Sequence, residues 1–340
     1  MARELKPLYC VRLLRVVLLL AGGVLLTILV ARIGWAPIVD VLARLAWWQF
    51  ALICLPYGLV MVVDTLGWRY AFTRSQAPFH RLLGARIAGE ALNVVTALGS
   101  VGGEALKAWL VRRDVPYEES VPSVIIAKTT ITVAQALFLL IGIVLAWTTL
   151  AVDSEILGAM LWLLVVEVLA VGGFFVAQVM GLVARAGRLL VWAGTLESAD
   201  YARRLDRALR DYYREQWRRL ALSVGFHLVG WLVGALETVI IVAVLAMPVS
   251  VSTATVIEAL GSGVRFATFL VPANLGALEG ANAAAFAALG LGAGAGLAYS
   301  LVRRARQAVW VGVGIVVLLV MRAGSGRALG RRAPSRRSAA

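Results

Sequence analysis

The chain has 340 residues, of which 61% are hydrophobic and only 15% are charged. Soluble domains average about 45–50% apolar and about 25% charged residues. This composition, with a mean hydropathy of +0.86, therefore excludes a soluble enzyme and a disordered chain. Long apolar runs cross lipid as helices that satisfy their own backbone. The sequence predicts an all-α, polytopic integral membrane protein, with residues 1–321 as one transmembrane domain.

The net charge of +14 would suggest a nucleic-acid partner for a soluble chain, but here the basic residues are clustered. Nine lie in Gly181–Arg219 and six in Arg322–Ala340. This clustering is typical of positive-inside topology and of contact with anionic headgroups, and no nucleic-acid recognition motif accompanies it. We expect both termini in the cytoplasm, membrane lipids as partners and no nucleic acid.

Apolar runs of suitable length predict about six full spans. The first follows a basic N-terminus like that of a signal peptide. It has no convincing small-residue cleavage site, so we interpret it as a retained helix. The predicted spans are Leu13–Ala31, Leu45–Gly67, Val121–Thr149, Ile156–Gly181, Leu220–Met247 and Gln307–Met321.

The segment Ile87–Arg113 is apolar enough to enter the membrane, yet glycines interrupt it and it carries charged residues. Glycine-broken helices at membrane depth are tolerated where they line a cavity or are buried in protein. We predict a helical hairpin that enters and leaves on the cytoplasmic face. The interrupting glycines are Gly99, Gly102 and Gly103, and the charged residues are Glu90, Glu104 and Lys107.

A second interrupted unit comprises Val256–Val271, a break from Pro272 to Gly276, and an Ala/Gly-rich helix over Leu278–Tyr299. Three predicted full spans separate the two units. Three is odd, so the second unit enters from the outer face.

The two interrupted units share a spacing. A glutamate follows each break, and a basic residue comes 24 residues later: Lys128 after Glu104, and Arg303 after Glu279. This suggests an inverted repeat, an architecture whose broken helices meet at a central substrate site.

The segment Gly181–Arg219 contains an apolar stripe at helical spacing opposite arginines. It predicts a cytoplasmic amphipathic helix that lies in the membrane interface or, equally, packs on its own protein. The arginine-rich tail, residues 322–340, is predicted to be disordered. The stripe consists of Tyr201, Leu205, Leu209, Tyr212 and Trp217.

Ionisable side chains inside spans cost about 2.5–3.5 kcal/mol each to insert and are functional candidates by default. Glu104 and Glu279 rank first, because each lies near the start of a half-helix, whose N-terminus stabilises a carboxylate. Either they bind a headgroup or exchange a proton, or they are structural caps. The other candidates are Asp64, Glu90, Lys128, Glu167, His227, Glu237, Glu258 and Arg265.

Basic residues of the second half need partners. Arg303, Arg304 and Arg306 fall near the outer face, against the positive-inside pattern. They indicate either an error in the topology or a site for lipid phosphate, which arginine binds with a planar fork. Arg265 shares a helical face with Glu258, seven residues away, which fits an internal ion pair as well as a binding site.

His227 lies on a different helical face from Glu237, and both a proton or headgroup role and interhelical hydrogen bonding remain open for it. Cys10 and Cys54 support neither a disulfide framework nor a metal site. No nucleotide-binding, nucleophile-elbow or metal-ligand motif is present in the sequence. We expect no enzymatic activity, no metal and no cofactor.

The stretch IAGEALNVVTALGSVGGEALKAWLVRR (Ile87–Arg113) resembles the membrane domain of lysylphosphatidylglycerol synthases, the flippase-like superfamily. HLVGWLVGALE (His227–Glu237) and VIEALGSGVRFATFLVPANLGALEG (Val256–Gly280) resemble most closely the hopanoid-biosynthesis-associated membrane proteins within it. The chain departs from the pattern at Ala97, where a proline is expected, and at Ala127, where an acid is expected. The resemblance implies functional positions at Glu90, Asn93, Gly102, Gly103, Glu104, His227, Glu237, Glu258, Arg265, Pro272, Gly276, Glu279, Arg303 and Arg304.

The resemblance implies a bacterial inner-membrane protein. The chain ends without the soluble aminoacyl-transferase domain of the full synthases, so we expect that it does not make lysyl-lipid. The leading hypothesis is a lipid translocase or lipid-export component for a hopanoid or another polar-headgroup lipid. One alternative is a non-transporting membrane partner that docks lipid-biosynthesis or export proteins through Gly181–Arg219. Another is an intramembrane enzyme that modifies lipid. The sequence does not indicate an oligomeric state.

Overall fold

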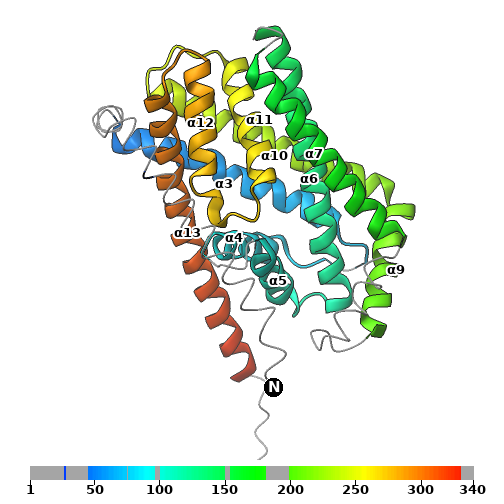
Figure 1. Ribbon diagram of the computed structural model, residues 1–340. Coiled ribbons are helices and arrows are strands. Elements are labelled where there is room, and N and C mark those ends of the chain that lie inside the picture. Colours follow the sequence, from blue (N-terminus) through cyan, green and yellow to red (C-terminus); the bar gives the residue numbers. More distant parts are fainter. Residues whose placement is uncertain are drawn as a thin grey trace, which may run out of the picture.

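The computed structural model describes residues 27, 45–74, 76–95, 100–149, 154–180 and 199–330. Within these ranges all regular structure is helical (Figure 1), so the all-α prediction is confirmed. The elements are α3 (Trp47–Tyr70), α4 (Phe79–Val95), α5 (Ser100–Val111), α6 (Tyr117–Thr149), α7 (Glu155–Val179), α9 (Ala199–Glu215), α10 (Trp217–Val244), α11 (Val251–Ala267), η1 (Pro272–Asn274), α12 (Ala277–Ala288) and α13 (Ala293–Gly330).

Five of the described helices, α3, α6, α7, α10 and α13, are long and apolar enough to cross a membrane. They overlap five of the six predicted spans. The remaining one, Leu13–Ala31, lies outside the described residues apart from position 27. Large side chains of α7 such as Trp162 and Leu169 point outward and are 73% and 70% exposed. Such a surface suits lipid tails, which are as apolar as leucine.

The chain contains two units with the same order of helices, α3 to α6 and α10 to α13. In each unit a spanning helix is followed by a helix of 17 residues, one of 12 residues and a second spanning helix. Figure 1 shows the α11–α12 pair above the α4–α5 pair, with the turn after α11 between them. The shared order of helices is what a repeat of two units requires, and the inversion of one unit relative to the other stays a prediction.

The two units exchange packing partners. Helix α4 packs on α13 and α11 packs on α6, while α3 and α10 pack against each other. Both exchanged contacts are close: a Cβ at Gly314 of α13 would overlap Ala91 of α4, and one at Gly142 of α6 would overlap Ala259 of α11. Small residues permit such approach between helices in lipid. This exchange brings charged residues of both units into the same helical bundle.

The predicted boundaries of the last two helices are wrong. The sequence placed a helix over Leu278–Tyr299 and the last span over Gln307–Met321. In the structure a tight turn separates α12 from α13, and Gly290 and Gly292 in it have φ of 74° and 86°. Glycine adopts positive φ without steric strain. Helix α13 then runs unbroken through residues 293–330.

Helix α13 also continues into the predicted disordered tail. Residues 322–330 are helical, and residues 331–340 lie outside the described part of the chain. At about 1.5 Å rise per residue, the 38 residues of α13 extend well beyond a hydrocarbon core of about 30 Å. One end of this helix therefore projects out of the bilayer.

The amphipathic helix predicted within Gly181–Arg219 corresponds to α9. Of the two alternatives, α9 packs on its own protein, because Leu209 and Tyr212 on its inner face are buried. The Tyr212 hydroxyl donates to the Tyr70 carbonyl oxygen at 3.0 Å, and the Tyr213 hydroxyl donates to Gln178 Oε1 at 2.8 Å. Burial raises the pKa of Tyr213 to about 12, which keeps this phenol a donor.

Candidate functional site

The first charge cluster joins four helices, α3, α4, α5 and α10. Lys107 of α5 bridges two carboxylates: its Nζ lies 2.7 Å from Glu90 Oε1 and 2.9 Å from Glu104 Oε1. Lys107 is only 4% exposed, so its charge depends on both partners. The cluster consists of Asp64, Arg86, Glu90, Glu104, Lys107 and His227.

Asp64 holds the other side of this cluster. Arg86 Nη2 donates to Asp64 Oδ2 at 2.6 Å, and His227 Nδ1 lies 2.9 Å from Asp64 Oδ1. All three side chains are buried. Within the described residues His227 Nε2 has no hydrogen-bond partner. His227 therefore makes an interhelical hydrogen bond between α10 and α3, one of the two roles that the sequence left open.

The α4–α5 hairpin is held by a close contact at Gly103. The Gly103 N–H donates to Asn93 Oδ1 at 2.8 Å, and a Cβ at Gly103 would overlap both Asn93 and the Gly89 carbonyl oxygen. Gly102 and Gly103 lie inside α5, so their prediction as helix-breaking residues is wrong. Gly103 permits contact between two helices, while residues 96–99, which connect them, lie outside the described part.

Gly103→Ala is therefore expected to destabilise the protein by about 1–3 kcal/mol, the usual range for overpacking a tight contact. The matched control is Gly172→Ala in α7, where an added Cβ meets nothing within 4 Å. That change should leave stability equal or raise it by up to about 1 kcal/mol. Thermal unfolding of the purified proteins in detergent measures the difference, and equal melting temperatures for the two variants would contradict the assignment.

The second charge cluster lies where α10, α11, α12 and α13 meet. Glu258 is at its centre and is 1% exposed. Its Oε1 lies 2.7 Å from Arg265 Nη2, and its Oε2 pairs with Arg303 and accepts a hydrogen bond from Thr238 Oγ1 at 2.9 Å. The Arg265–Glu258 pair is thus present. The cluster consists of Glu237, Glu258, Glu279, Arg265, Arg303, Arg304 and Arg306.

Glu279 has two partners at the start of α12. Its Oε2 accepts the Gly276 N–H at 2.7 Å, and its Oε1 lies 2.6 Å from Arg304 Nε. Arg304 also donates to the Ala273 carbonyl oxygen at 2.7 Å, which ties α13 to the break between α11 and α12. Gly276 has a φ of 79°. Glu279 is therefore a helix cap and an ion-pair partner at once.

The arginines of α13 do not lie near the outer face as predicted. They lie inside a spanning helix and face buried glutamates: Arg306 Nε is 3.1 Å and Arg303 Nε 3.5 Å from Glu237 Oε1. Both arginine side chains are mostly buried, at 8% and 14% exposure. The prediction failed because the span was expected to begin at Gln307, after these residues. Both arginines are thus paired with carboxylates inside the bundle.

Two small cavities adjoin Glu90. The α5–α6 cavity, of about 20 Å³, is lined by Arg86, Glu104, Lys107 and Lys128 as well as Glu90. The α4–α13 cavity, of about 10 Å³, lies between α3, α4 and α13. Each has room for one water at most. In this conformation neither cavity has room for a lipid headgroup.

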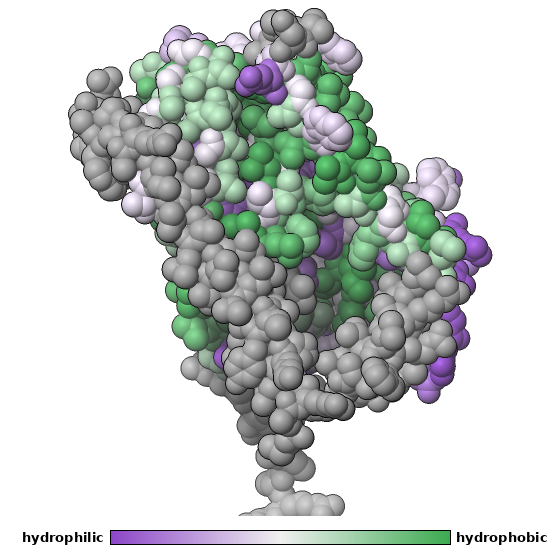
Figure 2. All heavy atoms as spheres, in the orientation of Figure 1, coloured by the Kyte–Doolittle hydropathy of each residue, from purple (hydrophilic) through white to green (hydrophobic). Residues whose placement is uncertain are grey.

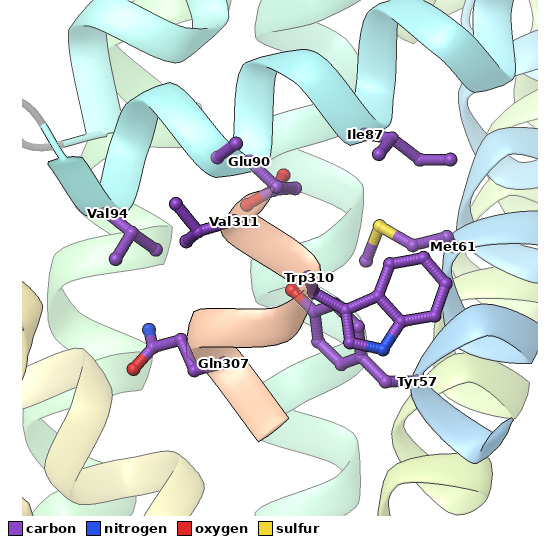
Figure 3. A pocket seen from close by; sticks show the side chains of 9 residues that line it. Tyr57, Met61, Ile87, Glu90, Val94, Gln307, Trp310 and Val311 are labelled. Carbon is purple, nitrogen blue, oxygen red and sulfur yellow. The ribbon is translucent and has the colours of Figure 1, made fainter. Parts of the chain in front are cut away.

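Figure 3 shows the α4–α13 cavity, with Glu90 above Trp310 and Val311 of α13 and with Tyr57 beside Trp310. Arg306 stacks over the Tyr57 ring, 4.2 Å from its centroid. Because Tyr57 contacts the second cluster and shares this cavity with Glu90, it connects the two clusters. On the face seen in Figure 2, hydrophilic residues lie in a hollow between hydrophobic flanks.

Sequence reasoning missed several members of this site. Arg86 was not among the predicted site residues, although it lies next to the apolar run of the first hairpin. Tyr57 and Thr238 carry no signal in the sequence that separates them from other residues of their spans. Glu167 remains apart from both clusters: it is fully buried, and neither carboxylate oxygen has a hydrogen-bond partner in the described part of the chain.

A comparison with known protein families assigns the chain to one of them. Residues 12–323 match the model of the lysylphosphatidylglycerol synthase transmembrane region. The chain belongs to this family. The match covers both hairpins and both charge clusters. No curated protein and no solved structure matches the chain. Among the described residues, no group of three His, Cys, Asp or Glu side chains is placed to hold a metal ion.

Proposed function

We propose that this member of the family is a lipid translocase or lipid-export component of the bacterial inner membrane. It moves a lipid with a polar headgroup, a hopanoid derivative or a phospholipid, between leaflets and leaves the lipid chemically unchanged. The observation that supports this is the placement of buried ion pairs on two interrupted hairpins within one bundle. Charges in lipid are costly and mark substrate pathways, and repeat interfaces with broken helices are typical substrate sites.

In the proposed mechanism a lipid headgroup replaces one partner of each of these ion pairs. A phosphate competes for the lysine and arginine side chains, and a cationic headgroup competes for the glutamates. The cavities hold about one water each, so a headgroup passes only when the hairpins move apart. Its polar atoms then replace the partners that separate, while the acyl chains stay in the surrounding lipid. Glu104 and Glu279, one on each hairpin, are the carboxylates that we assign to headgroup binding or proton exchange.

Leaflet-resolved transfer in proteoliposomes tests the proposal. Labelled phospholipids and hopanoids are placed in one leaflet, and their appearance in the other is compared between protein-containing and empty vesicles. We expect protein-dependent transfer and chemically unchanged lipid. Folded protein that transfers none of these lipids would overturn the proposal. It would favour the membrane-partner alternative, for which the outward basic face of α9 offers a surface.

The proposed orientation places both termini in the cytoplasm, so the turns that follow α5 and α12 lie on opposite sides of the membrane. Arg112 and Ala288 are exposed at these turns. In a chain whose Cys10 and Cys54 are replaced by serine, Arg112→Cys should react with an impermeant maleimide only after permeabilisation. Ala288→Cys should react in intact cells. Labelling of both positions from one side would contradict the opposite entrance of the hairpins.

A further inference from the structure

Glu167 lies at the middle of the spanning helix α7, with twelve residues of the helix on either side of it. At about 1.5 Å rise per residue, it is about 18 Å from either end of the helix and falls at the centre of the hydrocarbon core. A charged side chain is most costly at this depth. Glu167 has no exposed surface, whereas its neighbours Val166 and Val168 are 46% and 53% exposed. Glu167 is thus turned inward from a helix whose other side meets lipid.

The carboxyl group of Glu167 has no partner in the part of the chain that the structure describes. Neither of its oxygens takes part in a hydrogen bond, and no cation pairs with it. In contrast, each of the six carboxylates of the two charge clusters has a lysine or arginine partner. A buried carboxylate with neither a counter-ion nor a hydrogen bond is so costly that such a group takes up a proton and becomes neutral.

The ionisable groups of the helices that pack on α7 are occupied elsewhere. In α11, Glu258 and Arg265 pair with each other, and in α6 Lys128 lines the α5–α6 cavity. Helix α9 meets α7 near its C-terminal end, where Tyr213 donates a hydrogen bond, about three turns beyond Glu167. Within the described residues, no charged side chain of these three helices lies close enough to act on Glu167.

The packing that covers Glu167 depends on α11, the first helix of the second hairpin. Helix α7 lies at the edge of the bundle and packs on α6 and α11 (Figure 1). One turn before Glu167, Leu163 approaches α11 so closely that a Cβ at Gly263 would lie 3.1 Å from it. The adjacent Ser262 carbonyl oxygen accepts a hydrogen bond from Gln135 of α6 at 2.7 Å. A displacement of α11 therefore loosens the contact between α6 and α7 that buries Glu167.

We propose that Glu167 is a reversible proton-binding site that couples lipid transfer to a proton gradient. The inference rests on the proposed translocase function and assigns the proton exchange of its mechanism to a residue outside both hairpins. In the packed state one Glu167 oxygen carries the proton, and the group is neutral. When α11 moves to admit a headgroup, water reaches the carboxyl group and accepts the proton.

The ionised Glu167 then opposes the return of α7 to its packed position, because the charge would be buried without a partner. Uptake of a proton from water removes this barrier and shifts the population back to the packed state. Release on one side of the membrane and uptake from the other carry one proton across in each cycle. Intramembrane acids have this role in pumps and transporters.

Infrared spectroscopy of the purified full-length protein tests the proton site without any transport step. At neutral pH the wild type should show the carbonyl band of a protonated carboxylic acid, which shifts in heavy water. Glu167→Gln should lack this band, because its amide has the size and charge of the neutral acid but no titratable proton. Glu155→Gln, the same change at the exposed start of α7, should keep the band. Both variants should melt at the wild-type temperature, which verifies folding.

Leaflet-resolved transfer of the labelled phospholipids and hopanoids tests the coupling. With one proton moved per lipid, a gradient of about one pH unit across the proteoliposome membrane should concentrate the transferred lipid up to about tenfold in one leaflet. Glu167→Gln should leave the lipid evenly distributed between the leaflets. Glu155→Gln should behave as the wild type.

Three results would overturn the proposal. They are an infrared spectrum that is the same in the wild type and Glu167→Gln, a lipid gradient that persists in Glu167→Gln, and a lipid gradient that follows a sodium gradient at equal pH. The last result would assign the coupling to a metal cation. The carbonyl band in a folded protein that transfers no lipid would support the proton site while refuting translocation, so the two failures are distinguishable.

Discussion

Glu279→Gln is expected to reduce lipid transfer about tenfold or more, because it removes a charge-assisted contact that is worth about 1.5–3 kcal/mol. The amide can still accept the Gly276 N–H, so the cap of α12 is retained. It cannot neutralise Arg304, whose Nε lies 2.6 Å from the carboxylate. The measurement is the initial rate of leaflet-resolved transfer at equal protein density.

The control for this prediction is Glu155→Gln, since Glu155 is an exposed acid at the start of α7 and its replacement should leave transfer unchanged. A Glu279→Gln/Arg304→Gln double variant separates folding from function. It should recover much of the stability lost in the single variant, because both charges are gone, but not the transfer rate. Wild-type transfer by either Glu279 variant would refute the role of this carboxylate.

Asp64→Asn is expected to give the largest loss of stability of any isosteric change in the bundle. Arg86, which is 5% exposed, would remain charged without its counter-ion, and His227 would lose its hydrogen-bonded carboxylate. Breaking a buried pair from one side costs about 3–5 kcal/mol. We expect a clearly lowered melting temperature in detergent and reduced amounts of protein in membranes.

A surface pair of the same residue types is the control. Asp114 lies 3.0 Å from Arg81, whose side chain is 44% exposed, and Asp114→Asn should cost less than about 1 kcal/mol. Adding Arg86→Gln to Asp64→Asn should restore part of the lost stability, because no unpaired buried charge remains. Equal melting temperatures for Asp64→Asn and Asp114→Asn would show that the buried pair does not hold α3 and α4 together.

The spanning helices were predictable because each is a long apolar run, and the backbone requirement in lipid leaves no other structure. Interactions within one helix were predictable too: Arg265 and Glu258 are seven residues apart and do pair. Interactions between helices were not. Asp64 finds Arg86 22 residues away and His227 163 residues away, and helical periodicity carries no information about such partners.

Glycines were the least predictable residues, because one residue type serves two purposes. Gly103 allows two helices to touch, whereas Gly290 and Gly292 end a helix with positive φ. Both uses look the same in an apolar sequence. Gly103 was therefore predicted to break a helix that is continuous in the structure. Gly290 and Gly292 were not recognised as the end of α12, so α13 was predicted to begin after its arginines.

The exchange of partners between the units also sets the order in which the bundle can be completed. Helix α4 emerges about 200 residues before α13, against which it packs. At about 5–20 residues per second, synthesis leaves α4 without that partner for roughly 10–40 s. During this time Asp64 and Arg86 can already pair, but Glu237 and Glu279 on later helices still await their arginines on α13. A nascent chain that stops before α13 therefore exposes uncompensated carboxylates to lipid, which makes it a substrate for membrane quality control.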